Sequence, residues 1–156
     1  MALRDDAVNE KDVWIADTGC NGHITNDMKW YVDFVEFTEP RRIGRHSSEP
    51  TLAWGTGTAI LPMMRPGGQS ELELHDVWFV PSLPYNLLSL NQLEELGVAY
   101  DWKTQLLLWT KSEWVLATVE PLNGIKAVKL DTEKVTKLKN ETRLVFLTVD
   151  FRVLHR

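Results

Sequence analysis

The residues Val13-Trp14-Ile15-Ala16-Asp17-Thr18-Gly19-Cys20 join an apolar run to an acidic residue, a hydroxyl residue and a glycine. The apolar residues before Asp17 suit a short buried strand. The glycine permits a tight turn and the close approach of a second backbone. A carboxylate at a strand end, partly out of water, lies where its pKa can be tuned. This stretch therefore predicts a strand that delivers an acidic group to a turn.

Asp17 has two interpretations at this point. Asp, Thr and Gly are common turn residues, so turn geometry alone explains the tripeptide. The alternative is a carboxylate placed for catalysis. An Asp-Ser/Thr-Gly tripeptide arises by chance in roughly one chain of this length in twenty. The remainder of the chain has to separate the two interpretations.

The composition predicts one domain with enough apolar residues for a core: 44 % of the 156 residues are hydrophobic and the formal net charge is -5. The densest basic cluster, Arg41-Arg42 with Arg45, is too short for a nucleic-acid patch, so we expect no direct binding of nucleic acid. No apolar run reaches membrane-spanning length, and residues 1–6 lack the apolar core of a signal peptide, so we expect no membrane partner. The single cysteine excludes an internal disulfide and suits a reducing compartment.

Cys20 and His23 have the C-x-x-H spacing of metal ligands. A zinc site needs three or four ligands, and the other histidines, His46, His75 and His155, lie in unrelated contexts. We therefore predict no metal. His23 is instead expected to be a packed histidine that bonds to the turn backbone, and Cys20 a small buried side chain near the turn.

Short segments with strand-like alternation recur along most of the chain, so the predicted class is all-β, as a small barrel or sandwich. Gly55 and Gly57 lie inside one strand pattern and indicate a bulge or a close backbone approach. One helix is predicted over residues 86–96, where leucines recur every three residues and Gly97 follows as a C-cap.

The predicted organisation follows from shifts in composition. Residues 1–12 are a polar lead-in and residues 13–130 are the β domain. Residues 131–143 are polar and Lys-rich, which indicates a linker. Residues 144–154 are apolar again and predict an extra strand or helix.

Several runs together resemble one family. They are Trp14-Ile15-Ala16-Asp17-Thr18-Gly19-Cys20, His23-Ile24, Gly55-Thr56-Gly57-Thr58 and Asp76-Val77-Trp78-Phe79-Val80-Pro81-Ser82-Leu83-Pro84-Tyr85-Asn86-Leu87-Leu88-Ser89, followed by Gln92-Leu93 and Gly97. Their order and spacing over residues 13–130 resemble the protease region of copia-type LTR-retrotransposon Gag-Pol polyproteins, a retropepsin-like β-barrel domain. Val153-Leu154-His155-Arg156 resembles the start of the pre-integrase region of such polyproteins, which places residues 144–156 at the start of the next region.

The resemblance implies a small closed β-barrel and an aspartic endopeptidase without a cofactor. Asp17 matches the catalytic aspartate, Thr18 the residue that bonds across a dimer, and Gly19 the turn glycine. Because the chain has one Asp-Thr-Gly, a pair of carboxylates requires a homodimer. The implied substrate is the element's own Gag-Pol polyprotein, cut in the cytoplasm within a virus-like particle.

The flap that covers the substrate in this family corresponds here to residues 44–50, with Arg45, His46, Ser47 and Ser48 inside it. Gly44 is the only glycine of this stretch, where the family often has two, and a stiffer flap would slow substrate entry. This departure supports an alternative, a catalytically inactive, decayed or domesticated module that binds a protein partner. The third hypothesis is a structural β domain with a coincidental Asp-Thr-Gly.

Overall fold

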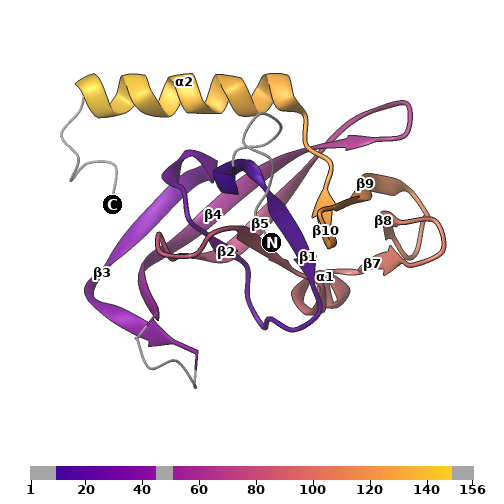
Figure 1. Ribbon diagram of the computed structural model, residues 1–156, viewed down its shortest axis with the longest axis horizontal. Helices are drawn as coiled ribbons and strands as arrows, with labels where there is room; N and C mark the ends of the chain where they lie inside the picture. The colour runs from indigo at the N-terminus through magenta and orange to yellow at the C-terminus, as the bar shows by residue number, and fades with distance from the viewer. Residues whose placement is uncertain (1–9, 45–50, 149–156) are drawn as a thin grey trace.

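The computed structural model describes residues 10–44 and 51–148 as a β-rich domain with a helix laid across it (Figure 1). The predicted all-β class is confirmed. In chain order the elements are the 3-10 turn η1 (Glu10–Asp12), β1 (Trp14–Asp17), β2 (Ile24–Thr25), the 3-10 turn η2 (Met28–Trp30), β3 (Tyr31–Ile43), β4 (Thr51–Arg65), β5 (Gly68–Phe79), β6 (Asn86–Ser89), α1 (Leu90–Leu96), β7 (Val98–Asp101), β8 (Leu106–Trp109), β9 (Val115–Leu122), β10 (Ile125–Val128) and α2 (Thr132–Thr148).

The strands form one sheet that stays open. Its order is β3-β4-β5-β2-β6-β1-β10-β9-β8-β7, so β3 and β7 are its two edges among the described residues. A closed barrel requires the first and last strands to pair. Here β7 is only four residues long and packs against α1, which directly precedes it. The structure therefore corrects the predicted closed barrel to an open sheet.

The long strands β3, β4 and β5 form an antiparallel meander in which two glycines allow close packing. A Cβ at Gly57 would lie 2.1 Å from the carbonyl oxygen of Asp33, and one at Gly55 would lie 2.2 Å from Cζ of Phe34. The pairing of β4 with β5 also shifts register between Gly57 and Ala59. The prediction of a bulge or close backbone approach at these glycines is confirmed.

The predicted helix over residues 86–96 is wrong for its first part and confirmed for its second. Asn86–Ser89 form β6, which pairs in parallel with β1, and the helix α1 covers only Leu90–Leu96. Ser89 is the N-cap and Gly97, with φ of 91°, is the predicted C-cap. The strand forms because Asn86–Ser89 pair with β1 on one side and with β2 on the other. This pairing outweighs the helical spacing of the leucines.

The core lies between the meander and the strands that follow it. Trp14 on β1 and Trp30 on η2 are almost fully buried and meet edge to face, with ring centroids 5.7 Å apart. Around them the largest core cluster collects aliphatic residues from β4, β5, β6, α1 and β7 to β9, together with Val135 of α2. Burial of Trp14 thus anchors β1, the strand that ends at Asp17.

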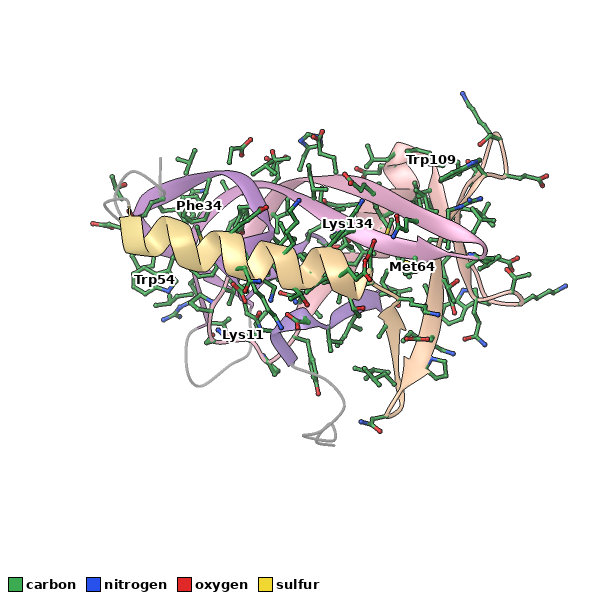
Figure 2. The ribbon with its side chains drawn as sticks, turned by 90° about the horizontal axis from the view of Figure 1, so that it is seen from above. Lys11, Phe34, Trp54, Met64, Trp109 and Lys134 are labelled. Atoms are coloured by element: carbon green, nitrogen blue, oxygen red, sulfur yellow. The ribbon has the colours of Figure 1, made fainter. Side chains whose placement is uncertain are left out.

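The residues predicted as a polar linker belong instead to α2, and the structure corrects this prediction. Figure 2 looks onto α2 and shows it lying across the sheet. Val135 is 4 % exposed in the core, and Lys134 and Lys139 form ion pairs with Glu71 and Asp12 at 3.1 and 2.5 Å. The segment is polar because one side of the helix faces solvent, and its few apolar residues are enough to attach it. The proposed start of a next region at residue 144 falls within this helix up to Thr148 and otherwise lies outside the described residues.

Candidate functional site

Asp17 is the last residue of β1 and is half-buried at the end of the strand. Its register partner is Ser89, the last residue of β6 and the N-cap of α1. The parallel pairing of β1 with β6 therefore brings the Asp17 turn and the start of α1 to the same place. The strand and turn predicted from the sequence are both present.

The turn after Asp17 is closed by its own carboxylate. The Gly19 backbone N–H donates to Oδ1 of Asp17 at 2.6 Å. A Cβ at Gly19 would lie 3.2 Å from the same oxygen, so a larger residue would crowd the carboxylate. Thr18 and Gly19 are exposed, which leaves the outer edge of the turn open to a partner. Gly19 takes part in the turn, and the bond of Thr18 across a dimer stays a prediction.

Three side chains at the start of α1 donate hydrogen bonds to backbone carbonyls of this turn. The Ser89 hydroxyl donates to the Cys20 carbonyl at 2.8 Å. Asn91 Nδ2 donates to the Thr18 carbonyl at 3.1 Å, and Gln92 Nε2 donates to the Asn21 carbonyl at 2.9 Å. These supporting residues were not predicted, because polar residues at the first turn of a helix are explained by capping alone.

His23 lies at the end of the turn and is 1 % exposed. Its Nδ1 accepts the Ser89 backbone N–H at 3.0 Å, and its carbonyl accepts the Trp78 N–H of β5 at 3.0 Å. Burial lowers the pKa of the imidazole to about 4. The prediction of a packed histidine is confirmed, although its side chain bonds to Ser89, the N-cap of α1, rather than to the turn.

Asn86 is a fully buried amide that joins β1, β2 and the N-terminal segment. Its Oδ1 accepts the Thr25 hydroxyl at 2.6 Å and the Asn26 N–H at 3.0 Å. Its Nδ2 donates to the carbonyls of Lys11 and Val13 at 2.9 and 3.0 Å. A buried amide with this set of partners fixes β1 relative to β2. Asn86 lies in a run that carries the family resemblance, but its structural role could not be predicted, because its partners lie far away in the sequence.

Cys20 lies beside Asp17 but is half-buried rather than fully buried. Its Sγ lies 3.9 Å from the Asp17 carbonyl oxygen, to which it donates. Burial, and to a smaller extent the charge of Asp17, raises the pKa of the thiol to about 11. The side chain is therefore a neutral thiol near neutral pH and is not activated as a nucleophile.

The predicted flap residues Arg45, His46, Ser47 and Ser48 lie outside the described residues. The flanking strands are described, and Ile43 of β3 pairs with Thr51 of β4. Figure 1 shows these ends of β3 and β4 and the turn after β1 toward the lower side of the molecule, whereas α2 runs along the upper side.

Two cavities, of about 260 and 300 Å³, lie along α2, and neither is lined by Asp17, Thr18 or Gly19. Within the described ranges no group of three or more His, Cys, Asp or Glu side chains could hold a metal ion. None of the helices in the described part of the chain is long and apolar enough to cross a membrane.

Comparisons with known proteins identify one family. The model of the "Pol polyprotein, beta-barrel domain" family matches residues 14–98, which include β1, the Asp17 turn, the meander and α1. A Saccharomyces cerevisiae protein whose name refers to the transposon Ty5-1 is 35 % identical over 79 residues. That match covers 49 % of this chain and 47 % of the yeast protein, so the chain spans about half the length of this relative. No solved structure matches the chain.

Proposed function

The chain belongs to the family of Pol polyprotein β-barrel domains, and from this we propose that it is the protease region of a copia-type retrotransposon polyprotein. The proposed activity is that of an aspartic endopeptidase, with Asp17 as the catalytic residue. The observation that carries the proposal is the placement of Asp17. Its carboxylate ends a buried strand, is oriented by the Gly19 N–H at 2.6 Å, and is only half-buried.

The proposed enzyme is a homodimer with its active site at the two-fold axis. Aspartic proteases of this class use two carboxylates, and this chain has a single Asp-Thr-Gly. The exposed edge formed by Thr18 and Gly19 lies beside Asp17, so a second copy packed against it would bring the two Asp17 side chains together. The Thr18 hydroxyl would then bond to the partner's turn.

The mechanism follows from the electrostatics of such a pair. Two carboxylates about 3 Å apart cannot both ionise, so they share one proton. The ionised carboxylate takes a proton from a water molecule held between them, and the protonated one donates to the scissile carbonyl oxygen. The resulting tetrahedral intermediate collapses with cleavage of the C–N bond and without a covalent enzyme adduct. The pair titrates as one unit, which favours activity at mildly acidic pH.

The proposed substrate is the Gag-Pol polyprotein of the element itself, cut in the cytoplasm within its virus-like particle. The family supports this substrate, since its members are parts of Pol polyproteins. Neither a nucleic acid, a membrane nor a cofactor is required by the proposed reaction.

A second candidate function is a catalytically inactive module that binds a protein partner. The observation that favours it is the stretch expected to form the flap, where Gly44 is the only glycine. In that case Asp17 would serve only to close its turn through the Gly19 N–H.

Self-processing separates the two candidates. A precursor that carries this chain with the flanking sequence of its element is compared with its Asp17→Asn variant at pH 5 to 6. We expect cleavage in the wild type and a loss of at least about 10³-fold in the variant, since one shared proton and one ionised carboxylate are both needed. Asp76→Asn is the matched control, because Asp76 is exposed and its positive φ of 55° is one that asparagine also tolerates. No cleavage from folded wild type would favour the inactive module, and equal cleavage in wild type and Asp17→Asn would contradict Asp17 as the catalytic residue.

A further inference from the structure

His23 connects the Asp17 turn to β5 and to the start of α1. Its carbonyl accepts the Trp78 N–H and its Nδ1 accepts the Ser89 N–H, each at 3.0 Å. Ser89 in turn donates its hydroxyl to the Cys20 carbonyl at 2.8 Å. The backbone donor and the side-chain donor of Ser89 are therefore both used to hold the segment from Cys20 to His23.

The direction of the bond fixes the charge and tautomer of His23. A nitrogen that accepts a hydrogen bond carries no proton, so the ring is neutral with its proton on Nε2. An imidazolium has donors on both nitrogens and would set an N–H against the N–H of Ser89. The acceptor at Nδ1 exists only while the ring is neutral.

The position of Ser89 makes this bond relevant to the carboxylate. Ser89 is the register partner of Asp17 in the parallel pair of β1 and β6. It is fully buried, and its Oγ also accepts the Gln92 N–H of α1 at 3.2 Å. A displacement of Ser89 would therefore move the strand end that presents Asp17 as well as the turn that follows it.

We propose that His23 is a positioning residue for Asp17: as a neutral acceptor of the Ser89 N–H it fixes the turn that presents the carboxylate, and protonation of His23 releases that turn. The part that concerns catalysis rests on the proposed function. The hydrogen bond and its dependence on the charge of His23 do not.

The charged residues around His23 are not the cause of its lowered pKa, so they leave this role unchanged. The titratable residues on the surrounding elements are Asp17 and Cys20 beside the turn, Glu71, Glu73, His75 and Asp76 on β5, and Glu94 and Glu95 on α1. Those on β5 and α1 are all exposed, and burial is the cause that lowers the pKa of His23.

The first test compares cleavage by wild type, His23→Asn and His23→Leu between pH 3.5 and 7. Asparagine places Oδ1 near the position of Nδ1, so it keeps the acceptor and cannot be protonated. We expect its kcat to stay within about threefold of wild type and its activity to extend to lower pH. Leucine removes the acceptor, and we expect kcat to fall by about 10- to 100-fold with a smaller change in KM, since small misplacements of a catalytic group have costs of this order. His75→Asn is the control, because that histidine is exposed.

The second test needs no variant and no activity. Nitrogen-15 NMR of the wild-type chain reports the protonation of both His23 nitrogens and the amide of Ser89 during a pH titration. We expect an unprotonated Nδ1 at pH 6, and a joint change of the His23, Ser89 and Gly19 signals near pH 4. The proposal is overturned if His23 titrates without a change at Ser89, or if His23→Leu keeps the wild-type kcat and pH profile. Absence of Asp17-dependent cleavage would contradict the proposed function, whereas the titration would still decide the role of the hydrogen bond.

Discussion

At the scale of single residues, His23 makes the stability of the domain depend on pH. Burial moves its pKa from 6.5 to about 4 in the folded chain. As the pH falls, the unfolded chain therefore binds a proton before the folded chain does. The stability contributed by the neutral ring is complete above about pH 6.5 and is lost between about pH 6.5 and about pH 4. The shift corresponds to roughly 3 kcal/mol in the free energy of unfolding.

Urea unfolding at pH 7.5, 5.5 and 4.0 checks this dependence. As the pH is lowered, the free energy of unfolding should fall less steeply in His23→Asn than in wild type, because asparagine does not titrate. His75→Asn should follow the wild type, since His75 is exposed and its contact with Glu73 lies on the surface, where an ion pair contributes little. Parallel curves for wild type and His23→Asn would show that His23 is not the group responsible.

At the scale of elements, local sequence patterns predicted the strand and the turn at Asp17 better than the boundaries of the elements packed against them. The apolar run before Asp17 and the turn residues after it act within a few positions, so the strand and the turn could be predicted, whereas the roles of Asp17, Thr18 and Gly19 stay predictions. The strand β6 could not be predicted, because Asn86–Ser89 become extended only through pairing with β1 and β2. The roles of Asn86 and Ser89 depend on partners more than 60 positions away and leave no local signal.

Helix α2 is a second case that local sequence patterns did not predict, and its packing can be tested directly. Residues 131–143, which supply most of it, were predicted as a linker because most of them are polar, yet Val135 is 4 % exposed within the core. Val135→Ala should lower the free energy of unfolding by about 2 kcal/mol, since two buried methyl groups are lost. Thr136→Ala, an exposed neighbour, should change it by less than about 0.5 kcal/mol. Urea denaturation of both variants measures the difference, and equal effects would show that α2 is not part of the folding unit.

At the scale of the whole molecule, α2 and the proposed dimer contact lie on different sides of the sheet. In Figure 1, α2 lies along the side of the sheet away from the turn after β1. Val135 in the core attaches it there, and its ion pairs with Asp12 and Glu71 lie on the same side. The exposed edge at Thr18 and Gly19 is consequently left clear for a second copy, which is the arrangement that a carboxylate pair requires.

A mixing experiment tests whether two copies make one site. Wild-type and Asp17→Asn chains are dissociated, mixed in equal amounts and allowed to reassociate at a fixed total concentration well above that needed for dimerisation. Random pairing makes roughly one quarter of the dimers wild type on both sides. Mixed dimers have a single carboxylate and should be inactive, because the mechanism needs one ionised and one protonated partner. Cleavage should therefore fall to about one quarter of the wild-type rate. A monomer that acts alone would keep about one half, and that result would contradict the homodimer. Mixing with Asp76→Asn, which keeps Asp17, should leave the rate unchanged and shows that the dissociation step itself does no damage.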